Sequence, residues 1–179
     1  MRIISGTHKG RRLTAPKNLP VRPTTDFAKE ALFNVLHNRF YFDDLSVIDL
    51  FAGTGNISYE FASRGCKHIT CVDAHPGCIK FIAKTARELQ FSIETVKSDA
   101  FSFLEKTGRQ ADIIFADPFY DLPEDRFAEL VRLVFGNRLL LPDGLFIVEH
   151  FKRNTLAHLP HFSYSKKYGS SMFSFFEEE

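Results

Sequence analysis

Asp49-Leu50-Phe51-Ala52-Gly53-Thr54-Gly55-Asn56 carries the end of an apolar run into a segment with helical spacing. The two glycines of this turn let the backbone pass close to a ligand at the start of the helix. Ser58 stands where a dinucleotide-binding fingerprint would have its third glycine, which disfavours a ligand that contains a pyrophosphate. The turn therefore predicts a strand and a helix joined around a different small ligand.

The segments on both sides of this turn alternate between strand and helix signals. Apolar strand candidates lie at 46–51, 69–73, 92–96, 112–116 and 144–149, and helical stretches lie near 55–64, 76–89, 99–106 and 124–138. Such alternation predicts a parallel sheet with right-handed crossovers. Near the end of the chain, 162–165 and 172–175 alternate large apolar and small polar residues around Gly169, as in a hairpin. We expect an α/β, Rossmann-like fold with a mostly parallel sheet and a C-terminal β-hairpin, the arrangement of class I methyltransferases.

The length and the charge distribution predict one domain with a basic N-terminal arm. The chain has 179 residues, 44% of them apolar, which suffices for one core. We expect a single domain over 1–179, with the arm and a helix at 1–40 and a Rossmann-like catalytic core at 41–179. Residues 1–25 contain six Lys or Arg and no Asp or Glu, whereas the remaining 17 basic and 22 acidic residues sum to −5. The arm favours a polyanionic partner, and a solvated, partly disordered tail is the alternative.

Several classes of protein and site are disfavoured by the sequence. No apolar run approaches the roughly 18 to 20 residues of a membrane span, and the basic N-terminus is not followed by a signal-peptide stretch, so we expect a cytoplasmic protein. Cys66, Cys71 and Cys78 show neither CxxC spacing nor an even count, so we expect them to be reduced. No cluster has convincing metal-ligand spacing, and no metal is expected.

Acidic residues at the ends of the strand candidates indicate a nucleoside cofactor. Asp73 lies 20 residues after Gly53, where a carboxylate can accept hydrogen bonds from ribose hydroxyls, although an exposed turn residue is the alternative. Asp49 would repel a pyrophosphate but attract an ammonium group, which favours S-adenosylmethionine over NAD. Asp99 could contact an adenine edge or cap a helix. The predicted cofactor-binding residues are Asp49, Phe51, Gly53, Gly55, Asn56, Asp73, Ala74, Asp99 and Ala100.

Asp117-Pro118-Phe119-Tyr120, which we call the tetrad, ends the fourth strand candidate. The exocyclic amine of a nucleobase is a poor nucleophile, because its lone pair is delocalised into the ring. The Asp117 carboxylate and the Pro118 carbonyl could each accept one amine hydrogen and direct the lone pair toward a methyl group. Tyr120 and Phe119 would stack on an unstacked base. The tetrad therefore predicts methyl transfer to a nucleobase amine, with an ordinary Asp-Pro turn as the alternative.

Taken together, these segments resemble the RsmD-type bacterial small-subunit rRNA guanine-N2 methyltransferases. The resemblance runs through the Gly-rich turn, the tetrad, Arg2-Ile3-Ile4-Ser5-Gly6, Lys9-Gly10-Arg11-Arg12-Leu13, Arg22-Pro23-Thr24, Lys29-Glu30-Ala31-Leu32-Phe33-Asn34, Ala62-Ser63-Arg64-Gly65 and Lys167-Tyr168-Gly169. It implies methylation of one guanine in 16S rRNA by S-adenosylmethionine, with the assembled or nearly assembled small subunit as substrate. The family pattern is Asp-Pro-Pro-Tyr, and Phe119 in place of the second proline removes a constraint on φ.

The resemblance also gives the basic arm a role, since Lys and Arg contacts to phosphates supply affinity and orientation without reading sequence. The predicted RNA-binding residues are Arg2, Lys9, Arg11, Arg12 and Arg22. We expect 16S rRNA or the small subunit as partner, and a monomeric enzyme. Two alternatives remain: an adenine-N6 or other amino methyltransferase acting on DNA or another RNA, which the tetrad alone permits, and a non-catalytic RNA-binding assembly factor that retains a nucleoside pocket.

Overall fold

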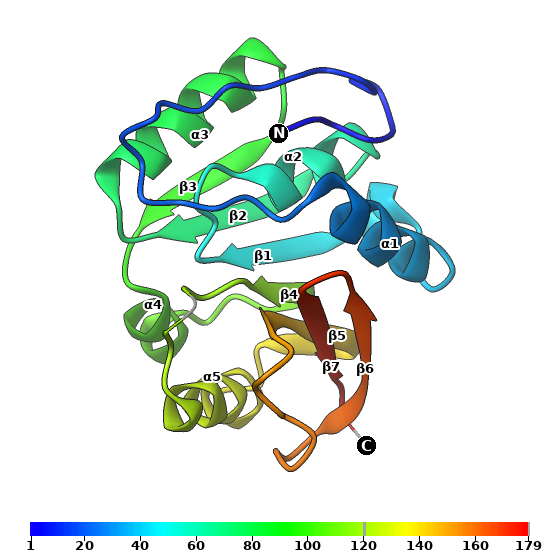
Figure 1. The fold of residues 1–179 in the computed structure, drawn as a ribbon, viewed down its shortest axis with the longest axis vertical. Helices are drawn as coiled ribbons and strands as arrows, with labels where there is room; N and C mark the ends of the chain where they lie inside the picture. Colours follow the sequence, from blue (N-terminus) through cyan, green and yellow to red (C-terminus); the bar gives the residue numbers. More distant parts are fainter. Residues whose placement is uncertain (120, 179) are drawn as a thin grey trace.

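A seven-stranded sheet forms the centre of the protein (Figure 1). The computed structural model describes residues 1–119 and 121–178. The strands are β1 (Ser46–Leu50), β2 (His68–Asp73), β3 (Ile93–Lys97), β4 (Ala111–Ala116), β5 (Leu140–Phe151), β6 (Phe162–Tyr168) and β7 (Ser171–Phe176), in the order β3-β2-β1-β4-β5-β7-β6. Strands β1 to β5 pair in parallel, and β7 is antiparallel to both β5 and β6. The predicted parallel sheet with a terminal hairpin is confirmed.

Helices cover both faces of this sheet. They are α1 (Asp26–His37), α2 (Asn56–Ser63), α3 (Pro76–Glu88), α4 (Ala100–Lys106) and α5 (Glu124–Gly136), with a short 3₁₀ helix η1 at Phe42–Asp44. Apolar residues of α1, α2 and α3 join one buried cluster, and those of α4 and α5 join another. Figure 1 accordingly shows α4 and α5 together, apart from the other three helices. None of the described helices is long and apolar enough to cross a membrane.

The largest difference from the predicted elements is the start of β5. The sequence predicts a strand from residue 144, whereas β5 begins at Leu140 and passes through Pro142, Asp143 and Gly144. These are turn-forming residues, and the strand accommodates them with an irregularity: the pairing with β4 shifts, and Asp143 has a φ of 61°. Local turn chemistry was therefore a correct signal for irregular backbone but a wrong signal for the strand boundary.

The basic arm packs against the helices of one face. It runs beside α3 and α2 before it enters α1 (Figure 1). Ile3 is 1% exposed, and the arm turns back on itself so that Arg2 and Arg12 form an antiparallel bridge. The backbone N–H groups of Ile4 and Ser5 donate to the Glu60 carboxylate of α2, at 2.9 and 3.0 Å. The first residues of the arm are therefore anchored to α2, whereas residues 9–12 and 16–18 are exposed.

The chain connections bring the ends of β1 and β4 side by side. Strand β1 lies between β2 and β4, so the chain leaves β1 toward one edge of the sheet and later returns to its other side. In open α/β sheets, ligands bind outside the carboxyl ends of the strands at such a point. Asp49 near the end of β1 and Asp117 just after β4 both lie there.

Candidate active site

A cavity of about 590 Å³ opens at the carboxyl ends of β1, β2, β3 and β4, and its volume is within the range of small-molecule sites. We call it the main cavity. Eight of the nine predicted cofactor-binding residues line it: Asp49, Phe51, Gly53, Asn56, Asp73, Ala74, Asp99 and Ala100. Gly55 is the ninth, and it shapes the turn rather than the described wall. With a φ of 82° it precedes α2, and a Cβ atom there would lie 2.8 Å from the Tyr59 ring.

Asp49 supplies a buried carboxyl group to the wall of the main cavity. Its side chain is 2% exposed, and the Ser58 hydroxyl donates to its Oδ2 at 2.6 Å. Ser58 in turn accepts a hydrogen bond from the Cys71 thiol at 2.9 Å. Burial raises the pKa of Asp49 to about 7, against the opposing effect of the Ser58 hydrogen bond. The residue that replaces the third glycine therefore orients the carboxyl group best suited to an ammonium ion.

Asp73 is fixed at the end of β2 by two backbone donors. Its Oδ2 accepts from Gly53 N–H and its Oδ1 accepts from His75 N–H, both at 2.8 Å. Each carboxylate oxygen has a second lone pair with which it can accept a ligand hydroxyl. The alternative of a plain turn residue explains the bond to His75 but not the bond to the Gly-rich turn.

Both interpretations of Asp99 find support in the structure. Its Oδ1 caps α4 by accepting from Ser102 N–H at 3.0 Å, and the same residue lines the main cavity. The Asn56 side chain also has a structural role. It accepts from Lys29 Nζ at 2.8 Å and donates to the Thr24 carbonyl at 2.9 Å, so it ties the arm to the start of α2.

The first three residues of the tetrad lie between the main cavity and a second, smaller recess. Asp117, Pro118 and Phe119 line both spaces, while Tyr120 lies outside the described residues. Burial, followed by the negative charges of Glu149 and Asp49, raises the pKa of Asp117 well above its usual value. Phe119 is 66% exposed, and its ring meets Phe51 edge to face at 6.4 Å. An acceptor group and an exposed aromatic ring thus stand beside the space for a small ligand.

Sequence reasoning missed two parts of this site. The arm segment 19–24 lines the main cavity, and Glu149 at the end of β5 lines the second recess. A signal existed for each. Leu19-Pro20-Val21-Arg22-Pro23 is partly apolar without helical spacing, which suits extended backbone against a wall, and Glu149 is a charged residue that ends a strongly apolar strand.

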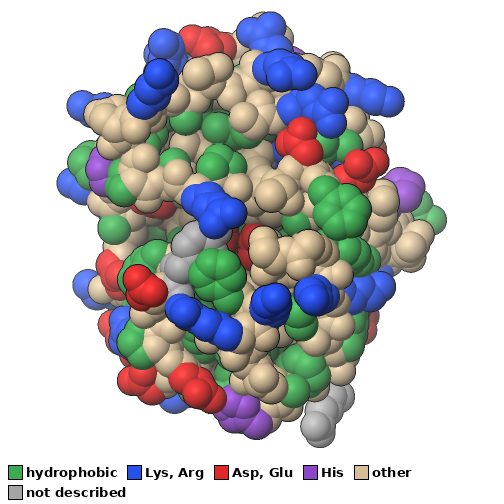
Figure 2. Space-filling model, viewed as in Figure 1, with side chains coloured by type: hydrophobic (Ala, Val, Ile, Leu, Met, Phe, Trp, Pro, Cys, Tyr) green, Lys and Arg blue, Asp and Glu red, His purple; other side chains and the backbone are tan. Residues whose placement is uncertain are grey.

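The predicted RNA-binding residues occupy different parts of one surface. Arg22 lines the main cavity, while Arg2 and Arg12 lie side by side, with Arg2 paired to Asp26 at 3.1 Å. Arg11 is exposed on the returning segment of the arm, and Lys9 lies in a turn beside the far end of α2. Figure 2 shows Lys and Arg side chains along the upper rim of this face, over the arm and α3. The described residues hold no group of His, Cys, Asp and Glu arranged to bind a metal.

The sheet with its antiparallel hairpin and the acidic cavity at the carboxyl ends of β1 to β4 define a class I S-adenosylmethionine-dependent methyltransferase. Residues 1–177 match the family model described as conserved hypothetical protein 95. The chain belongs to this family, that of the RsmD-type methyltransferases. The donor set fits the cofactor, because Asp49 can face its ammonium group and Asp73 its ribose hydroxyls.

Named relatives and a solved structure agree with this assignment. The chain is 32% identical over 161 residues to ribosomal RNA small subunit methyltransferase D of Escherichia coli K12, covering 89% of this chain and 79% of the relative. It is 34% identical over 155 residues to the putative rRNA methyltransferase YlbH of Bacillus subtilis, covering 84% and 82%. The structure of the putative methyltransferase yhhF from Escherichia coli superposes with a TM-score of 0.85 at 31% identity, covering 100% and 98%.

Proposed function

We propose that this protein methylates the exocyclic N2 amine of one guanine in 16S rRNA. The observation that carries the proposal is the position of the tetrad, whose first three residues line both the main cavity and the second recess. A group that borders both spaces can hold an amine against a methyl donor. Positioning of this kind converts a bimolecular step into an effectively unimolecular one.

The residues that line the main cavity can be assigned to cofactor binding or to binding of the target amine. Bound in the main cavity, S-adenosylmethionine supplies an electrophilic methyl group. Asp49 binds its ammonium group, Asp73 its ribose hydroxyls, and Asp99 its adenine amine. Asp117 and the Pro118 carbonyl accept the two hydrogens of the target amine, so the nitrogen lone pair points at the methyl carbon. Transfer would join the methyl carbon to the amine nitrogen and release the thioether S-adenosylhomocysteine, and Asp117 and solvent would take the surplus proton of the amine.

The substrate assignment rests on the relatives and on charge. Two relatives are named as rRNA methyltransferases, one of them for the small subunit. The arm carries six of the 23 basic residues and no acidic residue, which suits contact with phosphates. Action on ribosomal RNA implies a cytoplasmic location. We also propose that the protein acts as a monomer.

Methyl transfer from labelled S-adenosylmethionine to small ribosomal subunits that lack this modification tests the proposal. Nucleoside analysis of the product should yield N2-methylguanosine, at one position identified by primer extension. The Asp117→Ala variant serves as the control for transfer by contaminating enzymes. N6-methyladenosine in the product, or no transfer by a protein that binds S-adenosylmethionine, would reject the proposed base and favour the alternative substrates.

A further inference from the structure

The second recess is bounded by residues 117–119 on one side and by the end of β5 and the β6–β7 turn on the other. Its lining includes Asp117, Phe119, Glu149 and Ser171. The recess offers about 10 Å³, close to the space for a single water molecule. Such a space takes the edge of a ring rather than a whole base. The ring itself would then lie outside, over the exposed Phe119 side chain.

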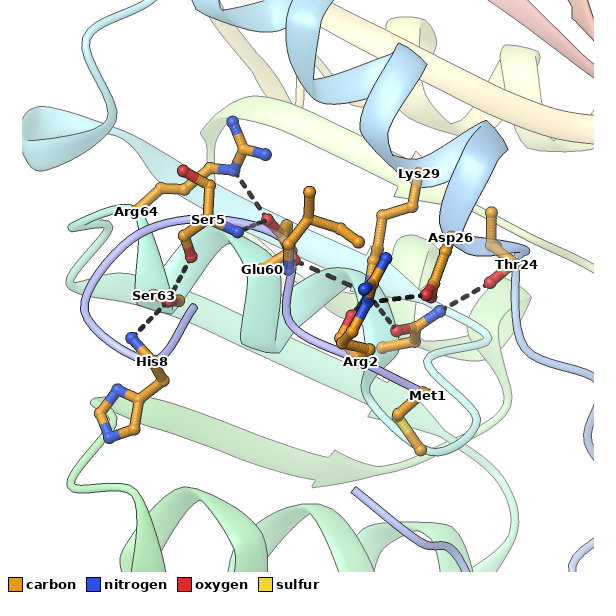
Figure 3. A network of polar contacts seen from close by, with 12 residues as sticks. Met1, Arg2, Ser5, His8, Thr24, Asp26, Lys29, Glu60, Ser63 and Arg64 are labelled. Atoms are coloured by element: carbon orange, nitrogen blue, oxygen red, sulfur yellow. Dashed lines mark hydrogen bonds and ion pairs between the residues drawn. The ribbon is translucent and has the colours of Figure 1, made fainter. Parts of the chain in front are cut away.

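Glu149 is held in this recess from two sides. Its side chain is 8% exposed, its Oε2 accepts from the Thr24 hydroxyl at 2.6 Å, and its Oε1 accepts from the Ser171 hydroxyl at 2.8 Å. Thr24 is itself fixed, because its carbonyl accepts from Asn56, which is bonded to Lys29. Figure 3 shows Thr24 and Lys29 in the network of polar contacts between the arm, α1 and α2. The arm and the hairpin thus orient one carboxylate.

The contacts with Thr24 and Ser171 do not by themselves explain why an acidic residue occupies position 149. Burial raises its pKa, while the Thr24 and Ser171 hydroxyls and the nearby Arg22 oppose that rise. The charge of Glu149 also raises the pKa of Asp117. Linking the arm to the hairpin does not require a second acidic group beside Asp117. The carboxylates of Asp117 and Glu149 border one recess and instead form a pair of hydrogen-bond acceptors.

We propose that Glu149 accepts the N1–H of the target guanine while Asp117 accepts a hydrogen of its N2 amine. The inference rests on the proposed function and explains the base specificity of the same site. Guanine carries these donors on adjacent atoms of its Watson–Crick edge, the edge by which unstacked RNA bases are recognised. Adenine presents a lone pair at N1, which would face the Glu149 carboxylate. Glu149 therefore selects guanine, and Phe119 offers an aromatic face for stacking.

The buried acceptor sets how strongly the site should prefer guanine over a base that lacks N1–H. A site that hydrogen-bonds a substrate N–H leaves its own polar group unpaired when an analogue lacks that hydrogen, which can cost up to about 10⁴-fold in specificity. Glu149 already accepts from two hydroxyl groups, so it loses less than a wholly unpaired acceptor. We expect a preference of at least about thirtyfold for the base that carries N1–H.

The test uses small subunits reconstituted with 16S rRNA that carries 2-aminopurine in place of the target guanine. This analogue keeps the 2-amino group but has a lone pair at N1. For the wild-type protein, kcat/KM should be at least about thirtyfold lower on 2-aminopurine than on guanine. In Glu149→Gln the amide can donate to N1, so this ratio should shrink at least about tenfold. Glu105→Gln, at an exposed position on α4, is the matched control and should keep the wild-type ratio.

The outcomes separate this inference from the function on which it rests. If the wild-type protein forms no N2-methylguanosine on the guanine substrate, the proposed function fails. If it does, and methylates 2-aminopurine with similar efficiency, the role of Glu149 is refuted without any variant. An unchanged ratio in a folded Glu149→Gln protein that binds S-adenosylmethionine would also refute it.

Discussion

Asp49, Asp117 and Glu149 are three acidic side chains at one site, and burial is the largest cause of the raised pKa of each. Their electrostatic effects differ because their neighbours differ. Asp49 receives a hydrogen bond from Ser58, Glu149 receives two from hydroxyl groups, and Asp117 is affected by the charges of the other two. The protonation state of Asp49 should therefore affect cofactor binding, and that of Asp117 should affect turnover.

The affinity for S-adenosylmethionine should rise as the pH increases from about 6 through 7. The pKa of Asp49 is about 7, so this group is half ionised there and, once negative, attracts the cofactor's ammonium group. The ammonium group is still mostly protonated at pH 7, since α-amino pKa values lie near 8. Titration calorimetry across this pH range checks the prediction. Asp49→Asn should bind weakly with a flatter profile, and a flat wild-type profile would contradict the assignment.

Replacement of Asp117 and of Asp73 should affect different kinetic parameters. Asp117→Ala should lower kcat at least about a hundredfold with little change in cofactor affinity, because it removes an acceptor of the target amine. Asp73→Ala should chiefly weaken cofactor binding, because it removes the proposed ribose contact and the anchor of Gly53. Equilibrium binding and single-turnover rates distinguish the two. Near-normal turnover in Asp117→Ala would remove the tetrad from the mechanism.

At the scale of elements, α2 connects the arm to the sheet through one fully buried residue. The Glu60 carboxylate accepts from two arm N–H groups and from Arg64 Nε at 2.9 Å, and it lies 3.6 Å from the buried Lys29 ammonium (Figure 3). Lys29 also donates to the Arg2 carbonyl. A single side chain of α2 therefore holds the arm and the start of α1 in register.

Glu60→Gln should lower the free energy of unfolding by about 3–5 kcal/mol, because it leaves Lys29 and Arg64 without their buried counter-charge. Urea unfolding measures this loss. If the arm and the core form one domain, as we propose, the variant should still unfold in one transition, with faster tryptic cleavage within the arm. Glu88→Gln, which breaks an exposed pair with Lys84, is the control and should change stability by less than about 1 kcal/mol. A loss no larger than in that control would exclude the proposed anchor.

The regular elements could be predicted because their signals are local. The 76–89 segment repeats apolar residues at helical spacing, and the observed α3 spans Pro76–Glu88. The alternation around Gly169 likewise predicted β6 and β7. The early start of β5 was missed, because Leu140 pairs with Ala111 of β4 ahead of the turn-forming residues, which lie in an irregularity before the pairing resumes at Leu145.

At the scale of the whole molecule, the arm unites two functions that the sequence suggested separately. Its first turn exposes basic side chains, and its later segment, 19–24, forms a wall of the main cavity. Thr24 then reaches Glu149, 125 positions away along the chain. RNA bound by the arm would consequently lie beside the site of methyl transfer.

Arg11→Ala combined with Arg12→Ala should weaken binding to small-subunit RNA and lower the slope of log affinity against log salt by about 2, about one unit for each lost phosphate contact. Filter binding at several salt concentrations checks this. Lys67→Ala combined with Lys106→Ala removes the same charge near the opposite ends of the strands and should leave the slope nearly unchanged. Equal slopes for both double variants would show that the arm makes no specific contribution.

The sequence by itself determined the alternation of strands and helices, the Gly-rich turn, the tetrad and the separation of basic arm from acidic body. These depend on residue type and short-range spacing, which act within a few residues of the chain. Only the tertiary structure decided that segment 19–24 lines the main cavity and that Thr24, Glu149 and Ser171 meet beside the tetrad. Such contacts join distant segments, and they form because burial of the arm on α2 and pairing of β5 with β7 bring those segments together.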